Sequence, residues 1–200
     1  MKKIMLMLFA VLLSLSACAK EPKPEDALKM FLDDYISLET MEFADYIKGD
    51  SPLANGSVLG TEDLTEELTQ RILDIYKHYT YEIGDVTISE DKTTATVSVL
   101  LTNFDGSTLY SDWMTTYITK AMELAFTNPD MTQADFEAIA IETFSDTLDA
   151  LVDGKEYSVE VKMVKDEKVW KLVGGDENYD LINAMSGGIL DSLKNINTPE

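Results

Sequence analysis

The chain has 200 residues, of which 37 are Asp or Glu and 16 are Lys or Arg, so its formal net charge is −21. This acidic excess excludes nucleic acid as an expected partner, because affinity for a phosphate backbone comes from Lys and Arg. The single cysteine leaves no internal disulfide, so the folded part must be stable through its hydrophobic core. The length suits one domain of ordinary size.

The amino-terminal segment has the pattern of a secretory signal peptide. Two lysines precede an uncharged apolar run over residues 4–13, and small and polar residues follow up to Ala17. The run is too short to cross a hydrocarbon core of about 30 Å, which needs roughly 20 apolar residues. Residues 1–17 are therefore predicted to be removed from the mature protein.

The end of this segment, Leu15, Ser16, Ala17 and Cys18, resembles the lipobox of bacterial lipoproteins. The resemblance implies cleavage before Cys18 and diacylation of its sulfur, and two acyl chains suffice for a lasting membrane anchor. The alternative is a plain secretory signal cut near Ala17, which would leave a lone exposed thiol.

Residues 18–24 have the composition of a tether, because charged residues alternate with Pro22 and Pro24 and such a sequence favours an extended spacer. Loss of Lys2 and Lys3 with the signal peptide leaves 14 basic against 37 acidic residues, a net charge of −23. Anionic headgroups repel such a domain. Lipid on Cys18 is thus the expected attachment to the extracytoplasmic face of the cell membrane.

Residues 25–195 are predicted to form a single domain, followed by a tail at 196–200. Apolar residues recur at helical spacing from Glu25 to Ile47, with a break near Thr40, and again over residues 62–78. Pro and Gly residues predict a loop at 49–60 between these two helical segments.

The apolar period then changes from that of a helix to that of a strand. Alternation predicts a hairpin with strands at 79–88 and 95–101, and a second hairpin at 157–164 and 168–173. Between the hairpins, residues 108–152 are predicted to form a pair of helices, the second opened by a capping box at Thr132 to Asp135. A last helix over 179–195 is interrupted by two glycines.

This order predicts an α+β fold, with helices over one face of an antiparallel sheet of at least four strands. The paired amino-terminal helices, the late strand pair and its segment Lys168-Val169-Trp170-Lys171-Leu172 resemble the nuclear transport factor 2-like (cystatin-like) domains of small bacterial surface lipoproteins without assigned activity. The resemblance implies a curved sheet and a carboxy-terminal helix, and the helix pair at 108–152 departs from it. Because that fold hosts enzymes, transport factors and inert scaffolds, it implies no activity.

No residue pattern predicts catalysis, a metal site or a cofactor. His78 is the only histidine, which excludes multi-histidine metal sites and His-containing triads elsewhere in the chain. The carboxylates lack the spacing of a calcium loop, and recognised catalytic motifs are missing. The candidate pocket or partner contacts are Trp113, Tyr117, Trp170, Gly187 and Gly188.

The aromatic candidates are equally explained as core residues. Each glycine inside a helix costs roughly 1 kcal/mol relative to Ala, so close packing, a kink or an approaching partner should offset it. These observations favour a non-catalytic binding or accessory domain whose partner is an envelope protein or a small ligand. The alternatives are a solute- or peptide-binding lipoprotein serving a transporter, and an isomerase-like enzyme that uses a pocket Asp and Tyr.

Overall fold

The computed structural model describes residues 22–37, 43–50 and 66–196. The predicted signal peptide, the lipobox with Cys18 and nearly all of the predicted loop at 49–60 lie outside the described residues, as do residues 197–200. Across the part of the chain that is described, no helix has both the length and the apolar character that a membrane span requires.

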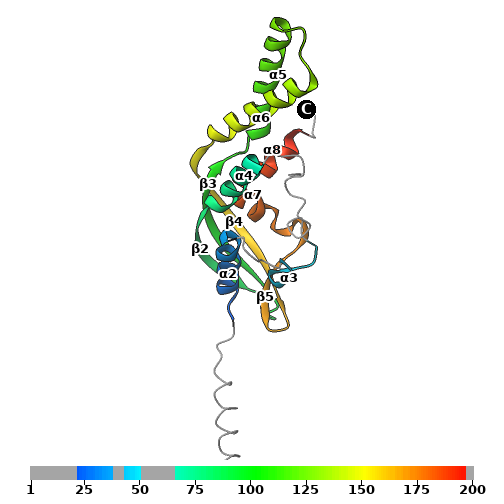
Figure 1. The fold of residues 1–200 in the computed structure, drawn as a ribbon. Coiled ribbons are helices and arrows are strands. Elements are labelled where there is room, and N and C mark those ends of the chain that lie inside the picture. The colour runs from blue at the N-terminus through cyan, green and yellow to red at the C-terminus, as the bar shows by residue number, and fades with distance from the viewer. Residues whose placement is uncertain (1–21, 38–42, 51–65, 197–200) are drawn as a thin grey trace, which may run out of the picture.

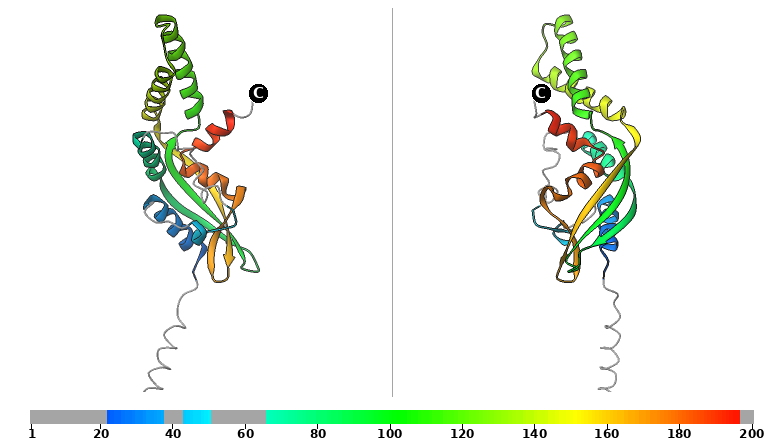
Figure 2. Two further views of the ribbon diagram at one scale, coloured as in Figure 1. Left: turned by 45° about the vertical axis from the view of Figure 1, so that its right-hand side comes forward. Right: turned by 180° about the vertical axis from the view of Figure 1, so that it is seen from behind.

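The described elements form a mixed α+β fold around a curved sheet (Figures 1 and 2). Five strands lie in the order β1-β5-β4-β3-β2. Their bounds are β1 Ile47–Lys48, β2 Thr80–Ile88, β3 Thr94–Asp105, β4 Val152–Asp166 and β5 Val169–Val173. The helices are α2 Pro24–Ser37, α3 Phe43–Tyr46, α4 Glu66–His78, α5 Leu109–Thr127, α6 Gln133–Asp149, α7 Tyr179–Met185 and α8 Ile189–Ile196, with a 3₁₀ turn, η4, at Gly175–Asn178.

The prediction of an α+β fold with at least four strands is confirmed, and three details of it are wrong. The sheet is not wholly antiparallel, because β1 pairs with β5 in parallel. β4 begins at Val152 instead of residue 157, and it pairs with β3 down to Asp105 through a register shift. The helix pair therefore occupies residues 109–149, not 108–152.

The core lies between one face of the sheet and the helices α2, α4 and α7. Along β3, Val97, Val99 and Leu101 are buried and alternate with half-buried polar or apolar residues on the other face. Ser98 and Glu160, which are register partners on that other face, illustrate its polar character. This alternation is typical of a sheet with one face covered and one face wet.

Helices α5 and α6 form an antiparallel hairpin that projects beyond the sheet (Figures 1 and 2). We call residues 109–149 the α5–α6 hairpin. It lies at the opposite end of the molecule from the start of α2, where the chain enters the domain. The predicted capping box is present, since the Asp135 carboxylate accepts the Thr132 backbone N–H at 2.8 Å.

The predicted last helix is divided where the sequence places its two glycines. α7 ends at Met185 and α8 begins at Ile189. Gly187 and Gly188 have φ angles of +63° and +80°, in the left-handed region that favours glycine. The glycine pair therefore forms a turn that lets α8 leave the sheet and pack against α5.

Candidate functional site

A hollow of about 670 Å³ lies at the root of the α5–α6 hairpin. It is bounded by the end of β3, the start of α5, the end of α6 and the start of β4. Its lining mixes apolar residues with four aspartates, three threonines, one serine and one lysine, and includes Asp105, Asp112, Thr116, Asp146, Asp153 and Lys155.

The carboxylates of this hollow are held by structural partners. The Ser107 hydroxyl donates to Asp105 at 2.7 Å and keeps the pKa of that carboxyl below its ordinary value, with Lys155 adding to the effect at 3.4 Å. His78 Nε2 lies 3.1 Å from Asp153 Oδ1. The hydrogen bond from His78 is the larger cause of a lowered pKa at Asp153, and the hydrogen bond from the Gly154 N–H is the second cause. Both aspartates are thus ionised at neutral pH.

Among the described residues, no three His, Cys, Asp or Glu side chains converge as ligands for a metal ion. His78, moreover, stacks its ring on Phe104 with centroids 4.2 Å apart. The His78 imidazole, at the end of α4, therefore contacts two strands: it bonds to Asp153 at the start of β4 and stacks on Phe104 at the end of β3.

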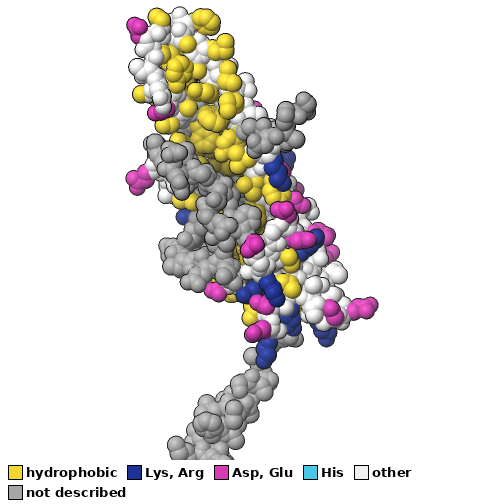
Figure 3. Space-filling view, turned by 90° about the vertical axis from the view of Figure 1, so that its right-hand side faces the viewer, with side chains coloured by type: hydrophobic (Ala, Val, Ile, Leu, Met, Phe, Trp, Pro, Cys, Tyr) yellow, Lys and Arg dark blue, Asp and Glu magenta, His cyan; other side chains and the backbone are white. Residues whose placement is uncertain are grey.

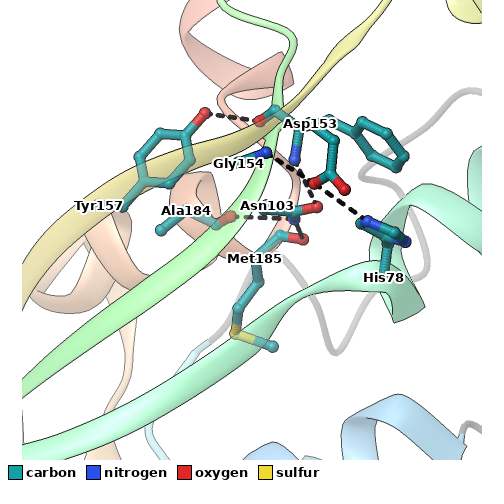
Figure 4. A network of polar contacts seen from close by, with 8 residues as sticks. His78, Asn103, Asp153, Gly154, Tyr157, Ala184 and Met185 are labelled. Atoms are coloured by element: carbon teal, nitrogen blue, oxygen red, sulfur yellow. Dashed lines mark hydrogen bonds and ion pairs between the residues drawn. The ribbon is translucent and has the colours of Figure 1, made fainter.

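A polar network joins the hairpin root to the rest of the fold (Figure 4). The fully buried Asn103 donates from Nδ2 to the carbonyl oxygens of Ala184 and Met185, at 3.2 and 2.9 Å, and its Oδ1 accepts the Phe104 N–H at 2.8 Å. The Tyr157 hydroxyl donates to the Phe104 carbonyl at 2.9 Å, and burial raises the pKa of that phenol. Its partners are backbone atoms, so the network fixes α7 and β4 to the end of β3.

The structure brings two of the predicted contact residues together inside the hairpin. Trp113 donates its indole N–H to the Ala140 carbonyl at 3.0 Å and meets the Phe144 ring edge-on at 5.3 Å. Tyr117 lies beside Trp113, with ring centroids 6.2 Å apart. Both residues are half-buried in the seam between α5 and α6.

The other predicted contacts lie elsewhere. Trp170 is buried in β5, away from the hairpin (Figure 1). Gly187 and Gly188 are buried against the polar network: a Cβ on Gly187 would lie 2.9 Å from the Phe104 carbonyl oxygen, and one on Gly188 would lie 3.0 Å from the Tyr157 hydroxyl. The five candidates therefore do not form one site in the structure.

An exposed apolar surface on α5 was not predicted from the sequence. Met114, Ile118, Met122 and Phe126 are 38%, 48%, 55% and 84% exposed. We call these four residues the apolar stripe. They follow one another at four-residue spacing, which places them along one side of the helix. The spacing of these four residues is visible in the sequence. It did not stand out because another side of α5, which packs on α6, is also apolar and is sufficient to explain the helical pattern.

Comparison with known proteins adds one structural likeness. No protein-family model and no curated protein matches the chain. The crystal structure of a candidate lipoprotein, ycdA, from Bacillus subtilis is similar, with a TM-score of 0.50 and 17% sequence identity over 86% of this chain. The match covers 58% of the ycdA chain, which is the longer of the two. At this identity the likeness shows a shared fold.

Proposed function

We propose that this chain is a bacterial lipoprotein that is cut before Cys18 and held by lipid at the extracytoplasmic face of the cell membrane. Two observations support this proposal. The first is the sequence from Leu15 to Cys18, with its preceding apolar run. The second is that ycdA, which shares the fold, is itself described as a candidate lipoprotein. We also propose that the sheet and its helical cover are nuclear transport factor 2-like, supported by the curved sheet with helices on one face.

The domain itself acts in this proposal as a non-catalytic binding or accessory module. The observation that carries it is the α5–α6 hairpin with its apolar stripe at the end remote from the start of α2 (Figures 1 and 3). Because α2 begins at Pro24, the last residue of the predicted tether, lipid on Cys18 would place the hairpin on the side away from the membrane. A projecting apolar surface there suits contact with another envelope component.

The surroundings of the candidate acid and base groups support the absence of catalysis. The hydroxyl of Tyr79 donates to the Leu32 carbonyl at 2.7 Å, and that of Tyr157 donates to the Phe104 carbonyl. Burial raises the pKa of both phenols above their ordinary value of 10, which makes them still poorer bases at neutral pH. A turnover by the purified protein that disappears with a single Asp substitution in the hollow, or with Tyr79→Phe or Tyr157→Phe, would overturn this part of the proposal.

Anchoring is tested by the Cys18→Ala variant produced in bacterial cells. We expect the wild-type protein in the membrane fraction and the variant, still folded by circular dichroism, in the soluble extracytoplasmic fraction. Ser14→Ala, a change outside the lipobox, is the matched control and should stay with the membrane. Tight membrane association of the Cys18→Ala variant would contradict lipid anchoring.

A further inference from the structure

The apolar stripe lies in a part of the molecule where exposed hydrophobic residues are concentrated. Ten large hydrophobic residues are exposed in the described part of the chain, and six of them lie in the α5–α6 hairpin, which makes up about a quarter of that part. Figure 3 shows hydrophobic side chains gathered over this end of the molecule. Scattered exposed hydrophobic residues need no explanation, whereas a contiguous group of them indicates an interaction surface.

The side of α5 centred on Ile118 carries no charge, and Glu123 lies at the edge of the stripe, three residues before Phe126. The three charged residues of α5 are Asp112, Lys120 and Glu123. At about 100° per residue they lie roughly 120 to 160° around the helix from Ile118. Lys120 is turned toward α6, where its ammonium lies 2.7 Å from Glu142. An ordinary solvent-facing helix surface would carry such charges itself.

The polar residues beside the stripe also direct their hydroxyls inward. Thr115 donates to the Ser111 carbonyl and Thr119 to the Thr115 carbonyl, each at 2.8 Å. Each hydroxyl is thereby bonded to the helix backbone one turn earlier, and the methyl group is what remains for contact. The stripe is therefore flanked by weakly polar surface and spans three turns, about 18 Å.

The hairpin does not need the stripe for its own packing. Trp113 and Tyr117 face α6, and Ala121, one turn further on, is buried at 7% exposure. The stripe lies on a different side of the same helix. Its residues are thus available to a second body without opening the α5–α6 seam.

The surroundings of the stripe are strongly negative. Residues 109–149 contain eight Asp or Glu and a single Lys, a net charge of −7. A second copy of this chain would bring the same negative hairpin into contact, and like-charge contact is unfavourable. Anionic lipid headgroups would be repelled in the same way, and the membrane that holds the lipid on Cys18 would lie at the other end of the domain. The charge of the hairpin therefore disfavours both a second copy and a membrane, and it favours a positively charged partner.

We infer that the apolar stripe of α5 docks an amphipathic helix with basic flanking residues from a partner protein. Three turns of stripe match the anchors of a helix of similar length, placed at i, i+4, i+7 and i+11. Two of the four stripe residues are methionines, Met114 and Met122, whose flexible side chains adapt to differently shaped anchors. The acidic hairpin supplies the charge complement and speeds association.

This inference rests on the proposed binding role, and its test is independent of lipid anchoring. The probe is a fluorescent synthetic 15-residue helix of leucine and lysine, titrated with the full Cys18→Ala chain and followed by anisotropy. A peptide of the same leucines with glutamate in place of lysine is the control ligand. We expect only the lysine peptide to bind, with affinity that falls as salt rises.

The matched variants are the double substitution Ile118→Gln with Met122→Gln, and Met30→Gln, which changes a methionine of α2 that is 52% exposed. The double variant should bind the lysine peptide about tenfold more weakly or worse, while Met30→Gln binds as the parent does. Circular dichroism checks that both remain folded.

Each of the following results would overturn the inference: no binding of the lysine peptide, equal binding of both peptides, binding unchanged in the double variant, or dimerisation of the chain that the double variant abolishes. Binding to phosphatidylcholine vesicles through the stripe would assign the surface to lipid and would also overturn it. None of these results bears on whether Cys18→Ala leaves the membrane, so failure of the docking inference and failure of the anchoring proposal are distinguishable.

Discussion

Replacing Asn103 by Ala should weaken the fold more than any comparable change on the outer face of the sheet. Asn103 has no exposed surface and makes three hydrogen bonds to backbone atoms: two donated to Ala184 and Met185 and one accepted from Phe104. A hydrogen bond contributes about 1 kcal/mol net, and a buried group left without a partner costs about 1–3 kcal/mol. We expect a loss of about 3 kcal/mol in the free energy of unfolding.

Urea unfolding followed by tryptophan fluorescence measures this loss, since Trp113 and Trp170 lie in the hairpin and in the sheet core. Asn103→Leu separates hydrogen bonding from cavity formation, because it restores volume and still leaves the two carbonyls of α7 without their donor. Thr102→Ala is the control, because Thr102 directly precedes Asn103 and its side chain lies on the other face of β3. This change should cost less than about 1 kcal/mol in the free energy of unfolding. If Asn103→Ala and Asn103→Leu both fall within 1 kcal/mol of the parent, the network does not hold α7 to the sheet.

Two further predictions concern the same region. Gly187→Ala should lower the free energy of unfolding by about 2 kcal/mol or more, because an L-residue at positive φ costs roughly 1–2 kcal/mol and its Cβ would meet the Phe104 carbonyl. Gly175, at φ +74° with nothing within 4 Å of an added Cβ, is the control, and Gly175→Ala should show only the smaller cost of backbone strain. Equal shifts in melting temperature for the two variants would contradict close packing at Gly187. Ser107 and His78 hold the pKa values of Asp105 and Asp153 below the ordinary 3.8, so these carboxylates stabilise the fold above that pH, and the stabilisation disappears as the pH falls through their lowered pKa values. Urea midpoints measured below pH 3.8 should therefore fall less in Asp105→Asn than in the parent, and an identical fall would contradict the assignment.

Most of the helices and strands were predicted from local patterns, because the spacing of apolar residues that distinguishes a helix from a strand is seen within a short stretch of sequence. β1 was missed because Ile47 and Lys48 become a strand only through pairing with Leu172 and Val173, which lie more than a hundred residues away in the chain. The start of β4 was missed because Asp153-Gly154 has the composition of a turn, although Gly154, at φ +90°, lies within the strand.

The polar network was equally invisible in the sequence. Asn103 follows the predicted strand 95–101, where a polar residue suggests solvent, and the two carbonyls to which it donates lie 81 and 82 residues further along the chain. Gly187 and Gly188 could be singled out because glycines inside a helix carry a known cost. Their role in letting α7 and α8 approach Phe104 and Tyr157 required the assembled structure.

The central proposal is a binding module held at the end of a lipid tether, and the amino terminus of the mature protein tests it most directly. Mass spectrometry of the tryptic amino-terminal peptide from membrane-extracted protein should find Cys18-Ala19-Lys20 carrying a diacylglyceryl group on its sulfur. An unmodified cysteine in that peptide, a terminus elsewhere, or a retained signal peptide would contradict the account.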